Sequence, residues 1–488
     1  MRKLCTCLAL GAGLFVVACG SDNDDPNGAG ASGTGAASSS SSGSGASAGS
    51  GATSSGGGGS GASSSGGEGG GGAPVVNPDA SEDWTRDLLS TGLDLNLTTL
   101  AGKATITIAG SDTSTGASFE VGDLVITKLT NDIGDVHFTV TDGQMDIGIP
   151  AGGDQTVVVE YTFASHVGSF DGWDATAGVS FLWPKFCGNL FPCKSDPSDG
   201  LTFTATIQGE PAGQTLVYPA SIPADAPSYQ FALASGEFTK LDLGTTTAGT
   251  QVSAWHLPGQ EAVAEQGTLS LRDVFDFYEQ TYGVYSFGGE VGSVSADWGD
   301  GDYGGMEHHP YWHVARGSFQ YEDVHAHEAA HGWYGDGVRI ACWEDFVLSE
   351  GTATYLAAVS LGVTGVDLWA DYDCALAKIC AAGGKTVALP DATCNDIDII
   401  THPLWSLVPY QKGAQFYREV EDILGFQAID EVLASFYADH ANGTARMQQM
   451  IDALQAKGTP DQAAAIDAVA TAWLRTEACP ANAPPLCD

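Results

Sequence analysis

The sequence has 488 residues, more than one small core requires, so we expect about three structural units. Hydrophobic residues make up 43% of the chain, which is enough to bury sizeable cores, although its 65 glycines are unevenly distributed. The 60 acidic and 18 basic residues give a formal net charge of −42, which excludes nucleic acid as the main partner because phosphate would be repelled.

The first residues have the features of an export signal. Arg2 and Lys3 precede an apolar run that ends in VVAC, at residues 16–19. This segment resembles a bacterial lipoprotein signal, whose final cysteine becomes the lipid-modified first residue. We therefore expect residues 1–18 to be a lipoprotein signal peptide and Cys19 to attach the protein to a membrane through its lipid. The alternative is an ordinary cleaved signal with an incidental cysteine.

Residues 19–77 are almost entirely Gly, Ser and Ala, a composition that buries nothing, so we interpret them as a flexible tether. Beyond the N-terminus, no stretch reaches about 18 consecutive apolar residues, so we expect no internal membrane-spanning helix. The expected location is outside the cytoplasm, lipid-anchored to the bacterial cell envelope, with the outer membrane favoured.

The cysteines also suggest export. Eight remain after Cys5 and Cys7 leave with the signal and Cys19 is lipidated, and an even number favours disulfides. Close spacing suggests three pairs, with a fourth to complete the set: Cys187–Cys193, Cys374–Cys380, Cys479–Cys487 and Cys342–Cys394.

Two patterns of apolar residues divide the rest of the chain. From about Trp84 to Leu243, apolar and polar residues alternate in runs such as KATITIAG and QTVVVEYTF. Seven or more such runs predict an all-β sandwich-like or saddle-like domain at residues 78–247. From about Leu271, apolar residues recur at three- and four-residue steps, which predicts a mainly α domain at 248–488. The expected fold class is therefore α+β, with more than one domain.

The most specific chemical signal is the pentad HEAAH at residues 327–331. On a helix, residues four apart share one face, so His327 and His331 can reach one metal ion, with Glu328 beside them. A catalytic zinc needs a third protein ligand and an open position for water, and Glu350 is the candidate. The alternative for the two histidines is a solvated position on a surface helix. The alternative for Glu350 is a first-turn glutamate that interacts favourably with the helix dipole.

These residues belong to a longer pattern. HEAAHGWYGD followed by WEDFVLSEGTATYL resembles the aminopeptidase N family of gluzincin metallopeptidases, in which 18 residues separate the second His of H-E-x-x-H-x-W-x-G from a ligand Glu. Three further segments are similar to motifs of that family. GGMEH at 304–308 resembles G-x-M-E-N, PYQKG at 409–413 resembles Y-x-K-G, and FPCKSDP at 191–197 resembles F-P-C-x-D-E-P.

The resemblance implies a thermolysin-like catalytic domain after the β domain and a role for each matched residue. His327, His331 and Glu350 would bind one Zn²⁺ per chain. Glu328 would be the general base, and Tyr410 would donate a hydrogen bond to the developing oxyanion. Taken alone, Tyr410 would be interpreted as a packed aromatic residue.

The resemblance also implies a substrate. Glu307 would hold the free α-ammonium group of a peptide, beside Gly304, Gly305 and Met306 of the same substrate-binding motif. The expected function is that of a zinc aminopeptidase that releases N-terminal residues from peptides with a free N-terminus, on the non-cytoplasmic side of the membrane. A zinc endopeptidase of the same fold, or a catalytically silent surface-binding protein, is the alternative. The sequence does not set the oligomeric state.

Some residues depart from the family pattern without removing a ligand. His308 and Asp336 each stand where the family has Asn, and Ser349 replaces the Asn before the ligand Glu. We interpret Asp345 as a residue that orients a ligand histidine. Many family members carry a large C-terminal helical domain, whereas 78 residues follow Tyr410 here, so we expect a more open site.

Overall fold

The computed structural model describes residues 76–298, 304–383, 386–395 and 397–487. The expected signal peptide, Cys19 and nearly all of the expected tether lie outside these described residues.

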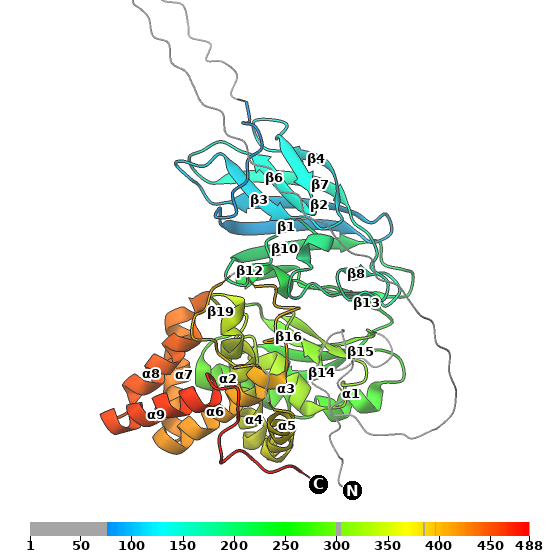
Figure 1. Ribbon diagram of the computed structural model, residues 1–488. Coiled ribbons are helices and arrows are strands. Elements are labelled where there is room, and N and C mark those ends of the chain that lie inside the picture. The colour runs from blue at the N-terminus through cyan, green and yellow to red at the C-terminus, as the bar shows by residue number, and fades with distance from the viewer. Residues whose placement is uncertain (1–75, 299–303, 384–385, 396, 488) are drawn as a thin grey trace, which may run out of the picture. The chain divides into compact units, whose positions relative to one another are not determined.

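A six-stranded sheet forms the centre of the N-terminal β region (Figure 1). Its strand order is β12 (Ser221–Pro227), β10 (Gly200–Gln208), β1 (Leu88–Asn96), β2 (Ala101–Ile108), β7 (Gln155–Thr162) and β4 (Val125–Thr130). Strands β1 and β10 are parallel, and the other neighbours are antiparallel. In β2, Ala104, Ile106 and Ile108 are buried while Lys103 is exposed, so the alternation in the sequence is the alternation of the two sheet faces.

Two smaller sheets complete this region. One has the order β3 (Gly116–Glu120), β6 (Gln144–Gly148) and β5 (Phe138–Thr141). The other has the order β11 (Thr215–Val217), β13 (Ala234–Gly236), β9 (Val179–Ser180) and β8 (Trp173–Asp174). Two 3₁₀ turns, η1 (Cys187–Asn189) and η2 (Ser228–Gln230), lie in the connections.

A five-stranded sheet opens the second half of the chain. Its order is β14 (Thr239–Thr245), β15 (Gln251–His256), β16 (Glu290–Ala296), β18 (Tyr311–Ala315) and β17 (Gly305–Met306). Strand β14 precedes the expected domain boundary at residue 247 and pairs with β15, which follows it. The expected domain ranges stay a prediction.

Helices make up most of the rest. They are α1 (Glu261–Gly267), α2 (Leu271–Tyr282), α3 (Glu322–Ala330), α4 (Phe346–Thr364), α5 (Trp369–Ala381), α6 (Leu407–Leu424), α7 (Phe426–His440), α8 (Met447–Lys457) and α9 (Pro460–Trp473). The 3₁₀ turn η3 (Trp343–Asp345) leads into α4, and a short sheet pairs β19 (Val338–Ile340) with β20 (Gly443–Ala445). The predicted change from strands to helices is thus confirmed.

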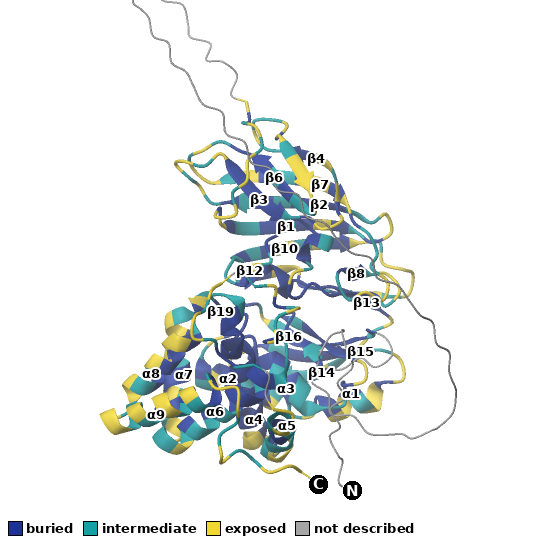
Figure 2. Cartoon of the chain, viewed as in Figure 1, coloured by how far each residue is buried: buried dark blue, intermediate teal, exposed yellow. Residues whose placement is uncertain are grey.

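Helix α4 is the core helix of the helical region, and every residue from Phe346 to Leu361 is buried (Figure 2). Apolar residues lie on all sides of this helix, as is typical of a helix in a protein core. Contrary to our expectation, one helical stretch of the described residues, Trp343–Thr364, is long and apolar enough to cross a membrane by length and composition. Polar residues interrupt the apolar run, but the mean hydropathy of the stretch stays high. Of its 18 most apolar consecutive residues, 89% are buried inside the protein.

Two facing glycines allow α4 and α6 to pack closely. A Cβ atom added at Gly413 would lie 2.5 Å from the Cα atom of Gly351, and one added at Gly351 would lie 2.8 Å from the Cα atom of Gly413. Real Cβ atoms do not approach backbone so closely, so neither position accepts a side chain without movement. The contact places the first turn of α6, with Tyr410, beside the Glu350 turn of α4.

Four disulfides join cysteines within the described residues. The predicted pairs Cys187–Cys193 and Cys342–Cys394 are confirmed. The other two predictions are wrong, because the structure joins Cys374 to Cys487 and Cys380 to Cys479. Cys374 and Cys380 lie on the same helix, α5, where six residues rise about 9 Å, beyond the ~7 Å that a disulfide can bridge between Cα atoms.

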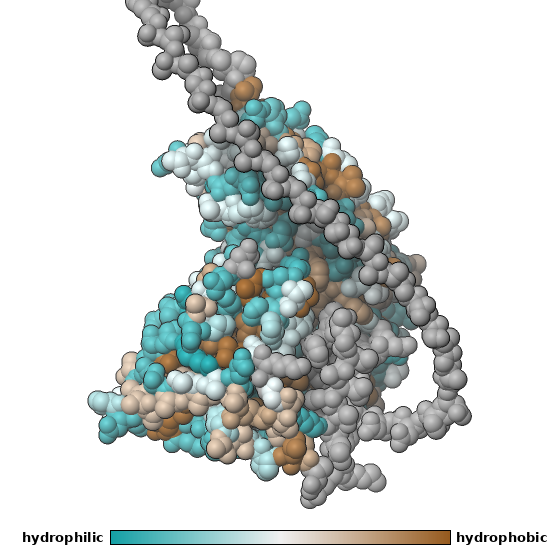
Figure 3. Space-filling model, in the orientation of Figure 1, coloured by the Kyte–Doolittle hydropathy of each residue, from teal (hydrophilic) through white to brown (hydrophobic). Residues whose placement is uncertain are grey.

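On the face shown in Figure 3, hydrophilic residues cover much of the described surface and the hydrophobic residues lie among them. The exposed large hydrophobic side chains come from distant parts of the sequence, such as Val125, Leu269 and Val363. Single exposed apolar residues of this kind are normal for a folded domain in water.

Candidate active site

The two histidines of the HEAAH pentad and Glu350 converge on one point. Helix α3 carries His327, His331 caps that helix, and Glu350 lies in α4. The His327 Nε2 atom is 3.1 Å from His331 Nε2 and 3.1 Å from Glu350 Oε2, and His331 Nε2 is 3.5 Å from the same oxygen. Ligands of a tetrahedral zinc at its usual bond lengths are about 3.3 Å apart. The three atoms therefore have the mutual spacing that zinc requires.

Neighbouring groups set which nitrogen of His331 faces this point. Its Nδ1 atom lies 3.0 Å from the carbonyl oxygen of Tyr334 and 3.2 Å from the hydroxyl of Ser349. A carbonyl only accepts, so Nδ1 carries a proton, and Nε2 is the nitrogen that faces the other two candidate ligands. Thr354 Oγ1 lies 3.5 Å from His327 Nδ1 and donates to the Glu350 carbonyl, which links the other two candidate ligands.

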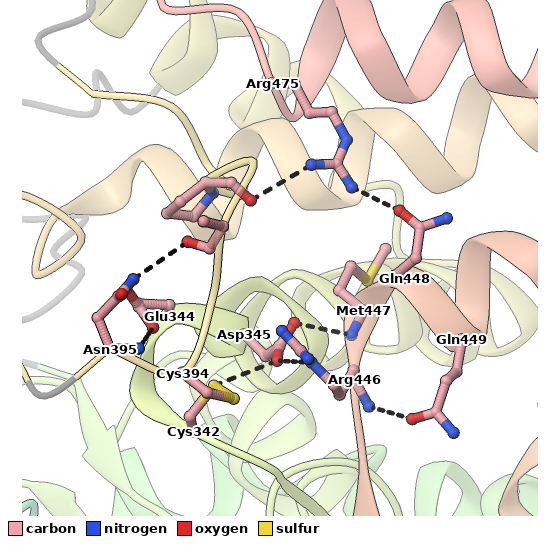
Figure 4. A network of polar contacts seen from close by, with 12 residues as sticks. Cys342, Glu344, Asp345, Cys394, Asn395, Arg446, Met447, Gln448, Gln449 and Arg475 are labelled. Carbon is pink, nitrogen blue, oxygen red and sulfur yellow. Dashed lines mark hydrogen bonds and ion pairs between the residues drawn. A yellow bond between two sulfur atoms is a disulfide. The ribbon is translucent and has the colours of Figure 1, made fainter.

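Asp345, expected beside a ligand histidine, has a different role. Its carboxylate accepts hydrogen bonds from Arg446 Nε, at 3.2 Å, and from the backbone N–H of Met447, at 3.0 Å (Figure 4). It therefore joins the turn before α4 to the start of α8, and that prediction is wrong. The reason is that Asp345 precedes the first turn of α4, whereas Glu350 lies one turn further along.

Glu328 is buried next to the metal-binding point. Its carboxylate, that of Glu307 and a ring nitrogen of His331 all lie within 4.8 Å of one another. Burial and the charges of Glu307 and Glu350 raise the pKa of Glu328 well above its usual value, against the opposing effect of His331. Strand β17 approaches so closely that a Cβ atom at Gly305 would lie 2.6 Å from Glu328 Oε1. Gly305 therefore leaves the space that the Glu328 side chain occupies.

Glu307 follows β17 directly and is 4% exposed. Burial raises its pKa to about 7; the charge of His331 opposes the shift and that of Glu350 adds to it. For Glu350, burial alone would raise the pKa, but the charge of His331 and hydrogen bonds with both histidines hold it at about 2. The Glu350 carboxylate is thus ionised at the candidate metal site, whereas the Glu307 carboxylate needs a positive partner to stay ionised.

Tyr410 reaches the same place from the first turn of α6. Its ring stacks on that of His327, with centroids 5.8 Å apart, and meets Phe346 edge-on at 5.9 Å. Burial and the carboxylates of Glu350, Glu307 and Glu328 raise its pKa well above the usual value. The hydroxyl therefore keeps its proton and can donate a hydrogen bond to a developing negative charge.

All the residues predicted from the sequence for metal binding, catalysis and substrate binding line one cleft: Gly304, Gly305, Met306, Glu307, His327, Glu328, His331, Glu350 and Tyr410. Other residues that line the cleft belong to no motif in the sequence, among them Phe181, Trp183, Asp323, Tyr372 and Trp405. Phe181 and Trp183 come from the β region, and Trp183 packs against Trp405 with ring centroids 4.3 Å apart. Only the tertiary fold brings these segments together, so no local sequence motif could predict that these residues line the cleft.

Asp336 and His308, which stand where the family has Asn, have buried polar atoms without a hydrogen-bond partner among the described residues. The carboxylate oxygens of Asp336 and the ring nitrogens of His308 are buried and make no hydrogen bond to any described residue. Burial, followed by the charge of Glu307, raises the pKa of Asp336 well above its usual value. Asp336 is therefore favoured in its neutral form next to the site.

Part of the sequence is similar to known metallopeptidases. Residues 309–473 match the model of the Peptidase family M1 domain. The chain is 25% identical over 285 residues to leucine aminopeptidase 2 of Neurospora crassa, an alignment that covers 52% of this chain and 41% of that protein. It is 26% identical over 282 residues to the leukotriene A-4 hydrolase homolog of Botryotinia fuckeliana, covering 51% and 42%. The chain thus spans less than half the length of these curated relatives.

Solved structures share the fold. An M1 zinc metallopeptidase from Deinococcus radiodurans matches with a TM-score of 0.69 and 18% identity, covering 85% of this chain and 98% of that one. Native yeast LTA4 hydrolase matches with a TM-score of 0.66 and 20% identity, covering 81% and 69%. These likenesses confirm the predicted fold class, a β-rich N-terminal region followed by a mainly helical one.

Proposed function

We propose that this chain is a zinc-dependent aminopeptidase of peptidase family M1. The observation that carries the proposal is the convergence of one atom each from His327, His331 and Glu350, at 3.1 to 3.5 Å, beside the buried carboxylates of Glu328 and Glu307. The match to the M1 domain over residues 309–473 supports it. Two imidazoles, one carboxylate and room for a fourth ligand are the donor set of a catalytic zinc.

His327, His331 and Glu350 would hold the metal. When bound, zinc supplies Lewis-acid activation of a water molecule and of the substrate carbonyl. Glu328 accepts the proton from the attacking water and returns it to the leaving amine. Tyr410 donates a hydrogen bond from its hydroxyl to the oxyanion that develops on the substrate. Each of these groups lines the same cleft, so a single bound peptide can contact all of them.

Glu307 gives the reaction its exopeptidase character. Its carboxylate is buried and close to Glu328, and an α-ammonium group is the positive partner that would keep it ionised. A peptide whose amine is held there presents its first peptide bond to Glu328 and to the candidate zinc ligands. An endopeptidase would need no such anchor.

The test is hydrolysis of aminoacyl fluorogenic amides by the purified protein, with and without a zinc chelator. We expect chelation to abolish activity and added zinc to restore it. N-acetylation of the substrate should reduce kcat/KM of the wild type by the equivalent of about 2 to 4 kcal/mol, and Glu307→Ala should cost about the same for free substrates. The two losses should not add, because both remove the same interaction.

Glu431→Ala is the matched control, because Glu431 is an exposed carboxylate on α7 that pairs with Lys457 outside the cleft. It should leave kcat/KM within about twofold, as expected for a surface substitution. Equal cleavage of acetylated and free peptides by the wild type would favour the endopeptidase. Zinc binding without hydrolysis of any peptide would favour a silent binding protein.

We further propose that the protein is exported and lipid-anchored through Cys19 to the bacterial cell envelope, with the catalytic cleft on the non-cytoplasmic side. The support is the sequence alone: the apolar run that ends in VVAC and the Gly/Ser-rich segment after it. Cys19→Ser should move the protein from the membrane fraction to the soluble fraction. Retention of the variant in washed membranes would refute the lipid anchor.

A further inference from the structure

One charged residue of the cleft has no part in the proposed chemistry. Asp323 lies in the first turn of α3, where its side chain lines the cleft next to Val324 and Tyr372. It is four residues before His327 and eight before His331, so the three side chains follow one helix face through successive turns. The nearer histidine is about 6 Å from it along the helix axis.

The arrangement gives the bound peptide a direction. Glu307 clusters with Glu328 and His331, toward the C-terminal end of α3. Asp323 lies at the opposite end of the same helix, beyond His327. A peptide with its amine on Glu307 and its first peptide bond at His327 and His331 therefore continues toward Asp323. An extended chain advances about 3.3 Å per residue, so the side chain that follows the scissile bond reaches this region.

The charges of the cleft leave Asp323 unbalanced. The described lining of the cleft contains four carboxylates, Asp323, Glu307, Glu328 and Glu350, and neither lysine nor arginine. Its two histidines, His327 and His331, would be neutral as zinc ligands. A divalent zinc ion and the substrate ammonium group contribute three positive charges, which balance the three glutamates. Asp323 remains as a negative charge without a positive counterpart in the loaded cleft.

The surroundings of Asp323 make a cation favourable there. Burial raises its pKa to about 6, the backbone N–H groups of Asp323 and Val324 oppose the shift, and the charges of Asp371 and Glu322 add to it. A positive group at the carboxylate would offset both the burial and the two like charges. Tyr372 beside it offers an aromatic ring, over which an aliphatic stem ending in a cation can also pack.

We propose that Asp323 is a specificity-determining residue that selects peptides whose second residue, the one after the scissile bond, is lysine or arginine. The inference rests on the proposed aminopeptidase function, because Glu307 and the candidate zinc ligands define where the peptide begins. A charge-assisted hydrogen bond at a partly exposed site corresponds to roughly a tenfold preference.

The experiment compares kcat/KM of the wild-type protein for Ala-Lys-Ala, Ala-Leu-Ala, Ala-Glu-Ala and Lys-Ala-Ala. We expect Ala-Lys-Ala to exceed Ala-Leu-Ala by about tenfold, with Ala-Glu-Ala below both. In Asp323→Asn, which keeps the shape of the side chain, the ratio of Ala-Lys-Ala to Ala-Leu-Ala should fall to about one. Asp371→Asn is the matched control, since it removes a neighbouring negative charge that does not line the cleft, and it should retain most of the preference.

Each outcome bears on one claim. Cleavage of all four peptides with equal rates for lysine and leucine in the second position would overturn the role of Asp323 and leave the aminopeptidase intact. A basic preference in the first position only would overturn the assignment to the second residue. A preference that survives in a folded Asp323→Asn protein would assign it to another group. Failure to cleave any of the peptides would instead contradict the proposed function. The wild-type comparison decides even if the variant does not fold.

Discussion

The contact between α4 and α6 gives a prediction that can be worked out from distances. In Gly413→Ala the new Cβ atom would lie 2.5 Å from the Cα atom of Gly351 and 2.8 Å from Val347 Cγ2. Carbon atoms pack best at about 3.5 to 4.0 Å, so the two helices must separate by about 1 Å. Tyr410 lies one turn before Gly413 on α6, while Glu350 is adjacent to Gly351 on α4. The substitution therefore moves the Tyr410 hydroxyl away from the candidate metal site.

A displacement of about 1 Å costs on the order of 10²-fold in turnover, and overpacking costs about 1 to 3 kcal/mol of stability. We expect Gly413→Ala to lower kcat on the order of 10²-fold. Zinc should stay bound, because His327 and His331 do not lie on α6. The assay combines kcat on an aminoacyl amide, zinc content and thermal unfolding.

Gly362→Ala is the matched control, because Gly362 is an exposed glycine of α4 whose added Cβ atom would meet no described atom within 4 Å. It should leave kcat unchanged and raise stability by up to about 1 kcal/mol. A folded Gly413→Ala protein with kcat within twofold of the wild type would refute the idea that this close approach positions Tyr410.

Three further predictions concern the site itself. His331→Ala should lose its zinc on dialysis, because two protein ligands remain where a catalytic site needs three; full zinc occupancy, measured by elemental analysis, would reject the ligand assignment. Glu328→Gln should retain zinc but lose on the order of 10² to 10⁴ in kcat, so near-normal turnover with bound metal would exclude it as the general base. Tyr410→Phe should lower kcat by about 10² to 10³ with little change in zinc content, and an effect confined to KM would argue against oxyanion stabilisation.

The local part of the site could be predicted from the sequence because helical geometry fixes it. His327 and His331 are four residues apart, and any α-helix places such residues on one face. The alternation of β2 and the apolar period of the helices likewise follow from local residue order, which is why the change from strands to helices was predicted. The motif resemblance added Glu350, Tyr410 and Glu307, which spacing alone would have left as a helix-start glutamate, a packed aromatic residue and a loop carboxylate.

Contacts between distant segments were decided only by the tertiary structure. Cys374 and Cys380 are close in sequence, but the straight axis of α5 separates them and each bonds to the C-terminal segment instead. The sequence predicts that Asp345 orients a ligand histidine, but its carboxylate instead accepts hydrogen bonds from Arg446 and Met447 at the start of α8.

The walls of the cleft also depend on contacts between distant segments. Trp183 meets Trp405 across more than two hundred residues of chain, and Asp323 becomes a cleft residue because α3 packs with its histidine face toward α4 and α6. Side-chain direction and long-range packing determine these pairs, and local sequence carries neither.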